Sequence, residues 1–576
     1  MKLKNNILTI GIAGILGMGL NSCSDFLTVE PLNQITQDKF WNSESDVENI
    51  VMGCYSAMQS QTIIDRMIVW GESRSDDMVG GTNINNNESL SNIFKENINA
   101  KNGYTSWGEF YDIINRCNLG LLYAPEVAAK DPNYSENDLN ATRAEVSAIR
   151  DLMYFYLIRA FRDVPYTTEA FVDDTQKQDL PATPFYEVLD NLIQDLESVR
   201  PYAVTNYPET KPLYQRGRIT RDCIDAMLCD MYLWKKDYAN AVKHADYVLE
   251  SKTNEFKSNG SSSSLFEGYP LLSDKSETSS SNTYGKSFNT IFGDGASKES
   301  IFELIFSSDE SMLSNGSVSY LYGNATTFPG IIKPADFISS DVPDAQYKVF
   351  KDKYDMRYYE NIEKQSSSIY GIGKYSNQTV TVNSAESEIT SAGRHYVSSN
   401  CYAPWIIYRT ADVMLMKAEA LTQMVTDEPE GDESLSAEVK AQNDSLLKAA
   451  YEIVNVIEKR SSMAGTYTDI SYSSYSSKSQ MDELILLERQ RELMFEGKRW
   501  FDLVRKSLRD GSTSFLINKV QQKGSESAGV VSSKLAKMDG LFWPSNNDEI
   551  KVNGNLKQNP SYGSGTESSY ETTNKK

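Results

Sequence analysis

Apolar residues recur at helical spacing in five long stretches of this chain. Within each stretch they stand three or four positions apart, which places them along one face of a helix. The five stretches span residues 149–160, 224–234, 238–249, 411–421 and 450–457. Because a one-sided apolar stripe needs a partner to cover it, the pattern predicts a mainly α-helical fold built from packed helices.

Two of these stretches follow each other closely enough to form a pair. Only Lys235, Lys236 and Asp237 separate the second from the third, which predicts two antiparallel helices joined by a tight turn. The residues from Tyr232 to Ala241 resemble the core of a tetratricopeptide repeat, where small residues let neighbouring helices approach closely. We therefore expect an irregular, tetratricopeptide-repeat-like helical scaffold.

The chain between residues 251 and 400 is mostly without this pattern and is rich in Gly, Ser, Asn, Tyr and Phe. Its best strand candidate is Ser300–Phe306. A loop-rich, aromatic insertion on a rigid helical support is a usual place for ligand binding. We expect helical regions over 23–250 and 401–562, the loop-rich ligand-binding insertion over 251–400, and a disordered tail over 563–576.

The N-terminus carries the marks of an export signal. A basic start is followed by an apolar and glycine-rich run, Ile7–Leu20, and then by Asn21, Ser22 and Cys23. This predicts a lipoprotein signal peptide over 1–22, because Cys23 after small residues resembles a bacterial lipobox, whose cleavage leaves a lipid-bearing cysteine. The alternative is an ordinary signal peptide with an incidental cysteine. The run is shorter than the roughly 20 residues of a membrane-spanning helix, so we expect anchoring through lipid alone.

Composition narrows the classes of function. The 576 residues carry a formal net charge of −22, which disfavours binding to nucleic acid. The chain has six cysteines with no CxxC pair and only two histidines, so we predict neither a metal site nor a cofactor. Cys223 and Cys229 fall in a helical pattern and are expected in the core. His244 stands among charged residues and is expected to be solvated.

Separated blocks of sequence, read together, resemble the SusD/RagB family of Bacteroidetes outer-membrane lipoproteins. They run in order over nearly the whole chain, which makes the set far more specific than any one block. The blocks are Ser24–Leu27, Glu30–Pro31, Phe40–Trp41, Gly53–Tyr55, Trp107, Tyr111–Asn118, Ala148–Phe155, Asp163–Tyr166, Tyr408–Ala420, Glu488–Leu503 and Gln558–Tyr562. Arg162 departs from the pattern, since the family usually has glycine there, and Asp151 and Cys223 replace small residues.

The resemblance implies both a fold and a role. It implies a helical scaffold of tetratricopeptide-like pairs with a loop-rich part that contacts ligand. Family members sit on the outer face of the outer membrane, cap a SusC-like TonB-dependent barrel, capture glycan fragments or peptides, and help deliver them to the barrel. It implies no enzyme activity, and it places the chain outside the cell, held by lipid such as palmitate on Cys23.

One motif invites a catalytic interpretation. Glu488, Glu492 and Glu496 lie four residues apart and alternate with arginines, and paired carboxylates are what a glycosidase needs. Carboxylates at this helical spacing beside arginines more often form salt-bridged structural networks, which we favour here. Asp412 and Glu419 are interpreted in the same way, as pairing residues.

The polar stretch after Trp70 supplies the first ligand-binding candidates. Arg74, Asp76 and Asn83 could hydrogen-bond sugar hydroxyls, because they precede or occupy a loop rich in turn-forming residues. In the family, this region borders the ligand surface. The alternative, equally supported, is a capping loop with surface charges.

Aromatic residues of the insertion supply the second set. A sugar ring presents an apolar face, so flat aromatic side chains in Gly/Asn-rich loops are expected partners. The candidates are Tyr284, Tyr320, Tyr322 and Phe328. Tryptophans inside the family blocks, at positions 107, 500 and 543, are expected in the core instead.

Three functions of different kind remain open. The first is a lipoprotein that binds glycans and passes them to a SusC-like transporter, with a peptide-binding RagB-like role as its variant. The second is a structural lid of the transporter with little affinity for free ligand. The third, a surface glycosidase, lacks a nucleophile elbow or metal-ligand spacing in the sequence.

Overall fold

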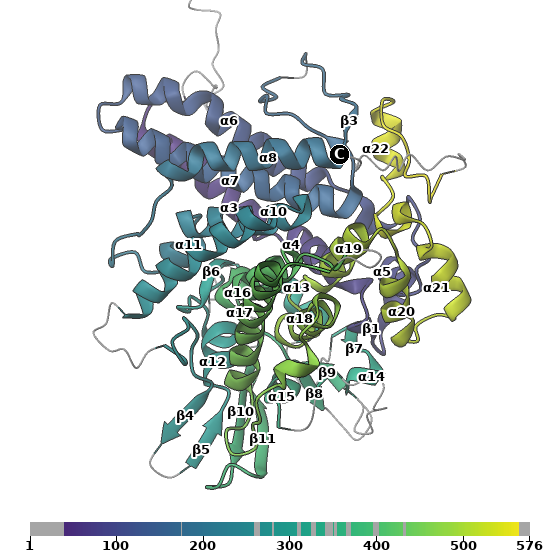
Figure 1. Cartoon of the computed structure of the whole chain (residues 1–576). Coiled ribbons are helices and arrows are strands. Elements are labelled where there is room, and N and C mark those ends of the chain that lie inside the picture. The colour runs from purple at the N-terminus through teal and green to yellow at the C-terminus, as the bar shows by residue number, and fades with distance from the viewer. Residues whose placement is uncertain are drawn as a thin grey trace, which may run out of the picture.

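The computed structural model describes residues 40–563, apart from residue 174 and the segments 258–264, 279–280, 308–312, 324–329, 340–348, 351–353, 365–369, 396–401 and 430–433. The predicted signal peptide, Cys23, Phe328 and all but the first residue of the predicted tail lie outside the described residues. Helices dominate what is described (Figure 1). Among the described helices, none is long and apolar enough to cross a membrane.

The N-terminal part is a stack of long helices joined by shorter ones. The helices are α3 (Glu44–Met58), α4 (Gln61–Ile68), α5 (Glu88–Phe94), α6 (Gly108–Lys130), α7 (Glu136–Phe161), α8 (Phe185–Val199), α9 (Tyr214–Gly217), α10 (Arg221–Lys235) and α11 (Tyr238–Lys257), with the π-helix η2 (Val69–Ser73) after α4. In sequence order α6 packs on α7, α7 on α8 and α10 on α11, which confirms the predicted scaffold of helix pairs.

The turn between α10 and α11 has a clear local cause. Lys236 adopts the left-handed conformation, with φ of 65°, and its N–H donates to the carbonyls of Leu233 and Tyr232. This caps the end of α10, and the chain reverses at once into α11. Ala241 and Ala245 are fully buried and allow the close approach that the sequence predicted.

The C-terminal part continues the helical layers. Its helices are α16 (Thr410–Gln423), α17 (Ala437–Ser461), α18 (Lys478–Leu493), α19 (Arg499–Asp510), α20 (Ser514–Gln522), α21 (Ala528–Leu535) and α22 (Asn547–Val552), with the 3-10 helix η9 (Met538–Leu541) between α21 and α22. Helix α16 packs against α11 and also against α17 and α18, so the two helical parts form one continuous body.

The middle of the chain is more ordered than the sequence predicted. It contains α12 (Lys286–Phe288), α13 (Gly316–Tyr322), α14 (Asp336–Ser339), α15 (Arg357–Asn361), β4 (Lys275–Thr278), β5 (Ser281–Tyr284), β6 (Ser300–Leu304), β7 (Ile332–Pro334), β8 (Ile362–Lys364), β9 (Tyr370–Ile372), β10 (Asn377–Val382) and β11 (Ile389–His395). Four of these strands form an antiparallel sheet in the order β11-β10-β5-β4, which projects from the helical body (Figure 1). The predicted strand at 300–306 is confirmed as β6, which pairs with β12 (Trp405–Arg409).

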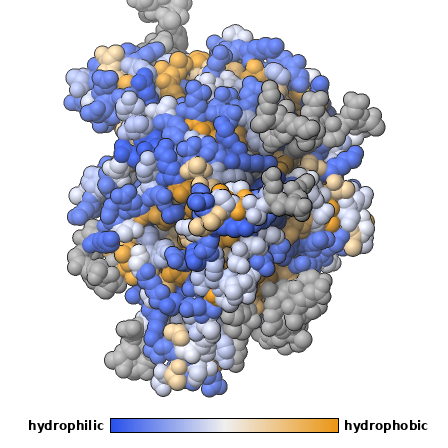
Figure 2. All heavy atoms as spheres, viewed as in Figure 1, coloured by the Kyte–Doolittle hydropathy of each residue, from blue (hydrophilic) through white to orange (hydrophobic). Residues whose placement is uncertain are grey.

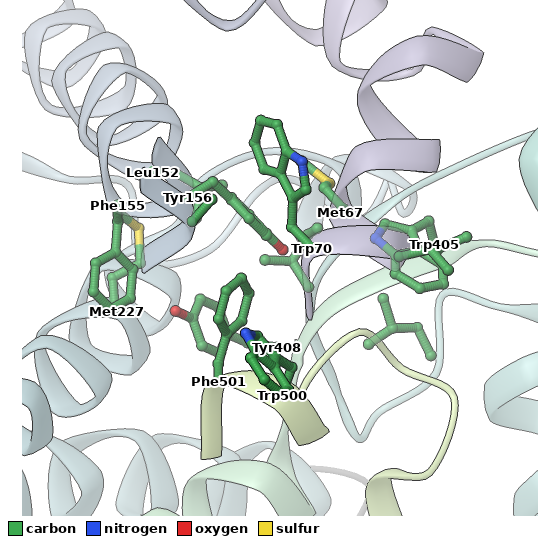
Figure 3. Packing of buried hydrophobic residues seen from close by; sticks show 14 of the residues in the cluster. Met67, Trp70, Leu152, Phe155, Tyr156, Met227, Trp405, Tyr408, Trp500 and Phe501 are labelled. Carbon is green, nitrogen blue, oxygen red and sulfur yellow. The ribbon is translucent and has the colours of Figure 1, made fainter. Parts of the chain in front are cut away.

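Three short antiparallel strand pairs remain, and one of them joins β8 to β9. Strand β1 (Met78–Gly80) pairs with β7, and β2 (Val164–Pro165) pairs with β3 (Ala182–Thr183). One large apolar cluster draws on all three expected regions of the chain, with Trp70, Tyr408 and Trp500 among its members (Figure 3). The three tryptophans expected in the core, at positions 107, 500 and 543, are all buried. Hydrophilic residues cover most of the face seen in Figure 2.

His244 corrects one prediction. It is fully buried rather than solvated, with Nδ1 2.7 Å from Asp225 and Nε2 3.0 Å from Glu197. Its sequence neighbour Asp246 pairs with Lys417, while the carboxylates that contact the imidazole come from α10 and α8. Cys223 and Cys229 are buried as expected.

Arg162, the departure from the family pattern, ends α7 with a φ of 71°. Glycine enters such a conformation without strain, which explains the usual residue at this position. Here the arginine side chain is held by Asp539 at 2.5 Å and by Asp163 at 2.8 Å. The two ion pairs offset part of the local backbone cost.

Candidate functional site

A short antiparallel ribbon brings two distant polar segments together. Strands β1 and β7 lie side by side, close to α5 (Figure 1). The pairing continues past the strands, because the Gly81 N–H donates to the Ile331 carbonyl at 2.8 Å. The Ile331 N–H in turn donates to the Tyr320 carbonyl at 3.3 Å. The polar loop Gly81–Asn87 is therefore tied to α13 through backbone hydrogen bonds.

Asn87 joins the loop to two tyrosines. Its Nδ2 lies 3.3 Å from the Tyr104 hydroxyl and 3.5 Å from the Tyr320 hydroxyl. Its Oδ1 accepts the Leu90 N–H at 3.0 Å and so caps the start of α5, which fixes the side chain. We refer to Gly81–Asn87 together with Tyr320 as the loop surface.

The loop surface offers both kinds of group that a sugar needs. Asn83, Asn85 and Asn86 are exposed and carry amide donors and acceptors. Tyr320 is half-buried, packed against the core on one side. Burial raises the pKa of Tyr104 to about 12, so its hydroxyl stays protonated beside the Asn87 amide. The exposed amides therefore belong to the same loop that Asn87 connects to the Tyr320 hydroxyl.

Asp65 of α4 lies under this surface and was missed by the sequence analysis. Burial is the main reason that its pKa rises to about 6, against the opposing effects of Ser317 and Arg66. Its Oδ1 has no hydrogen-bond partner among the residues that the structure describes. The available signal was a lone carboxylate in the apolar run of α4, Ile63 to Ile68.

Arg74 is in the core and not on the ligand surface. Only 1% of it is exposed, and its guanidinium donates to Glu96 at 2.8 Å. It also donates to the carbonyls of Leu541 at 2.9 Å and Gly540 at 2.8 Å, and it lies 4.3 Å from the Trp500 ring centre. Arg74 cannot form the expected hydrogen bonds to sugar hydroxyls here, because its guanidinium is buried and already donates to protein carbonyls and to Glu96.

Asp76 is likewise fully buried. It accepts two hydrogen bonds from Arg499, at 2.8 and 3.0 Å, and one from Gln490 at 3.1 Å. Although burial alone would raise the pKa of Asp76, the Arg499 guanidinium holds it below its usual range. The residues just after η2, which the sequence offered as a polar surface, therefore lie against the helices α18 and α19.

Of the aromatic candidates, Tyr284 and Tyr322 are buried. Tyr322 is 2% exposed and donates its hydroxyl to the Phe495 carbonyl at 3.0 Å. Tyr284 is 3% exposed and donates to Glu386 at 2.5 Å. Phe328 lies outside the described residues. Among the seven predicted ligand residues, the structure brings Asn83 and Tyr320 to one surface.

Glu488 and Glu492 of α18, with Glu496 just after its end, form the predicted charge network, and Glu488 pairs with Arg357 at 2.6 Å. Glu492 accepts from Arg409 at 2.7 Å and Arg357 at 3.2 Å, and it pairs with Arg460. Although burial would raise the pKa of Glu492, these guanidinium groups hold it well below its usual range. Glu496 is paired with Arg409 at 2.8 Å. These carboxylates are buried and charge-balanced, which is the structural arrangement the sequence favoured.

The network extends to the two further acids of the same prediction. Asp412 is paired with Arg489 at 3.0 Å, and Glu419 with Arg505 at 2.6 Å. Both carboxylates are buried. The interpretation of Asp412 and Glu419 as pairing residues is confirmed.

A cavity of about 270 Å³ lies between α18 and α20. Its walls combine Leu484 and Phe515 with the polar side chains of Gln490 and Lys519. The volume falls just below the roughly 300–1,000 Å³ of typical small-molecule pockets. The loop surface is therefore the stronger candidate, because it joins exposed amides with an aromatic ring.

Known proteins are similar to this chain over most of its length. A family model described as the SusD family matches residues 244–562, which is more than half of the chain. The SusD-like protein P38 of Formosa agariphila is 25% identical over 527 residues, covering 88% of this chain and 92% of that protein.

Solved structures share the fold. A SusD superfamily protein from Bacteroides vulgatus ATCC 8482 superposes with a TM-score of 0.64 at 18% identity, covering 91% of this chain and all of the other. A protein of the same organism, named as a candidate sugar-binding protein, superposes with a TM-score of 0.59 at 19% identity, covering 91% of this chain and 99% of the other. With its helical-pair scaffold and a family match over more than half of its length, the chain belongs to the SusD family.

Proposed function

We propose that this protein is a cell-surface lipoprotein that captures glycans and passes them to a SusC-like TonB-dependent outer-membrane transporter. In this proposal Cys23 carries the lipid that holds the chain to the outer membrane, facing the exterior. The observation that carries the glycan-binding part is the Asn87 contact, which fixes an exposed asparagine-rich loop beside Tyr320. Membership of the SusD family supports the surface location and the transporter partner.

The chemistry of the loop surface suits a sugar. A pyranose ring presents C–H groups that pack on an aromatic face, while its hydroxyls both donate and accept hydrogen bonds. Tyr320 supplies the aromatic ring, and Asn83 supplies an amide with donors and acceptors together. One or two such contacts on an open surface suggest a Kd in the micromolar to millimolar range, about −4 to −8 kcal/mol. Weak binding suits a protein that must release its ligand.

The test is a glycan array followed by isothermal titration calorimetry with the chain from Ser24 onward. We expect saturable binding to one class of glycan. We expect Tyr320→Ala and Asn83→Ala to weaken it about tenfold each, or about 1.4 kcal/mol, without lowering the midpoint of thermal unfolding. Tyr202→Ala is the matched control, because Tyr202 is 57% exposed and lies on another helix.

Other outcomes would redirect the proposal. Equal loss of binding in the Tyr202 and Tyr320 variants would show that the loop surface is not the site. A wild-type chain that binds no glycan would contradict glycan capture and favour a peptide ligand or a lid role. Co-purification of the full-length chain from membranes then tests for the barrel partner.

A further inference from the structure

Two cysteines from different helices face each other in the core. Cys54 of α3 and Cys117 of α6 have their Sγ atoms 3.7 Å apart, and the Cys117 thiol points at Cys54. Both side chains are fully buried. Cys223 and Cys229 offer a contrast, because both belong to α10.

The helices are packed closely where the cysteines meet. Gly120, one turn after Cys117, faces Ile50, which lies one turn before Cys54; a Cβ built on Gly120 would be 3.6 Å from the Ile50 side chain. The opposite chain directions of these neighbours mean that α3 and α6 run antiparallel here. A disulfide has an S–S distance of about 2.05 Å, so the two sulfur atoms need to close by about 1.7 Å. Side-chain rotation and a small helix shift supply such a distance.

We propose that Cys54 and Cys117 form a native disulfide while the exported chain folds. The proposal rests on the export that is part of the proposed function, because disulfides form and persist outside the cytoplasm. The oxidant is a disulfide-bearing protein or small disulfide. One cysteine thiolate attacks it to give a mixed disulfide, and the second displaces the remaining thiolate, so two protons leave and the two electrons reduce the oxidant to its dithiol.

The bond forms before the helices close over it. Burial raises the pKa of Cys117 well above its usual value, and the thiolate is the reacting species. In the folded chain neither sulfur is accessible to an oxidant. The same burial protects the finished disulfide from reductants.

The cross-link would restrict the segment of chain that carries the loop surface. It closes a covalent ring from Cys54 to Cys117, and Gly81–Asn87 and Asn87's partner Tyr104 lie inside that ring. A disulfide stabilises mainly by restricting the unfolded chain. It would also tie α3, the first long described helix after the predicted anchor, to the helical scaffold.

The experiment uses the full-length protein in two states. One sample is extracted from the membranes of cells that make it and is unfolded at lysis in guanidinium chloride with N-ethylmaleimide, so that buried free thiols are blocked as well. The other is reduced, unfolded in guanidinium chloride and refolded in a mixture of oxidised and reduced glutathione. After its circular dichroism is recorded, it is unfolded with N-ethylmaleimide in the same way. Trypsin digestion without reductant places Cys54 in peptide 40–66 and Cys117 in peptide 117–130.

We expect both samples to yield these two peptides joined, lighter by two hydrogen atoms than their sum. Peptide 222–235, with Cys223 and Cys229, is the internal control and is expected to carry two maleimide groups. A refolded protein with native circular dichroism and with maleimide on Cys54 and Cys117 would overturn the proposal. A bond present after refolding but absent from the membrane sample would overturn formation during export, and would count against the proposed location rather than the pairing.

Stability gives a second measurement. Reductant added during refolding is expected to lower the midpoint of thermal unfolding of the wild-type chain. The same reductant is expected to leave the midpoint of Cys54→Ala/Cys117→Ala unchanged. Cys223→Ala is the matched control and should respond to reductant as the wild type does. Equal responses of all three proteins would contradict the disulfide, whereas glycan binding by each is a separate readout of the proposed function.

Discussion

At the scale of single residues, burial separates the polar side chains that hold the fold from those that face a ligand. Arg74 and Asp76 come from a polar stretch with no apolar pattern, yet each is satisfied by partners far along the chain. Asn83, only seven residues after Asp76, is exposed. The stretch is polar throughout, so its composition does not distinguish buried from exposed residues. The distant groups that hydrogen-bond Arg74 and Asp76 decide which side chains are buried.

Asp65 carries a pH-dependent prediction. Its pKa is raised to about 6 in the folded chain, above the 3.8 of a free carboxyl. The folded state therefore binds more protons between these values, and the group destabilises the fold increasingly as pH rises from about 4 to 6. We expect Asp65→Asn to be more stable than the wild type at pH 7, by no more than about 3 kcal/mol, and equally stable near pH 4.

The measurement is the midpoint of thermal unfolding for both proteins from pH 4 to pH 8. Other carboxylates titrate in the same range, so the informative quantity is the difference between the two curves. A difference that stays constant with pH would contradict a raised pKa at Asp65.

At the scale of elements, the helices follow from their apolar periodicity, whereas the ribbon at the loop surface depends on close backbone contact. Gly330 has a φ of 80° and lies between α13 and β7. A Cβ there would be 2.5 Å from the Leu321 carbonyl oxygen and 2.5 Å from the Tyr322 carbonyl carbon. The position of Tyr320 against β7 therefore needs a glycine.

We expect Gly330→Ala to displace α13 and weaken glycan binding by more than Asn83→Ala does. The thermal midpoint should fall as well, because both the conformation and the contact are lost. Gly529→Ala is the matched control, since a Cβ at Gly529 of α21 meets nothing within 4 Å. Full glycan affinity in Gly330→Ala would mean that α13 does not take part in binding.

The sheet β11-β10-β5-β4 explains why elements in the middle region were missed. The alternation in β10 is one of burial, carried largely by Gln378, Val380 and Val382. Gln378 is polar, so the apolar pattern that identifies a strand is incomplete. Strand β10 is stabilised by pairing with β5, which lies about 100 residues earlier, and the local sequence of β10 does not show this partner.

At the scale of the whole molecule, buried ion pairs join the two ends of the chain. Arg499 of α19 donates twice to Asp76, which lies 423 positions earlier. Both groups are almost fully buried. Removing one partner of a buried pair leaves an uncompensated charge, so we expect Arg499→Met to lower the free energy of unfolding by about 3–5 kcal/mol.

Urea unfolding followed by circular dichroism checks this. Lys551→Met is the matched control. Lys551 pairs with Asp548 at 2.6 Å, but this pair is exposed to solvent, with 71% and 84% of the two side chains accessible. Exposed ion pairs contribute little to the free energy of unfolding. Similar losses of stability in the two variants would contradict the structural role given to the Asp76–Arg499 pair.

The sequence by itself determined the helical stretches, the tight α10–α11 turn, the charge network of α18 and membership of the SusD family. These features follow from the spacing of residue types over short stretches of sequence, which does not depend on contacts between distant parts of the chain. Tertiary structure decided which polar residues are accessible: it buried Arg74, Asp76, Tyr284 and Tyr322 and left Asn83 and Tyr320 together at one surface. The physical reason is that burial of a polar group depends on a partner, and here the partners come from distant parts of the chain.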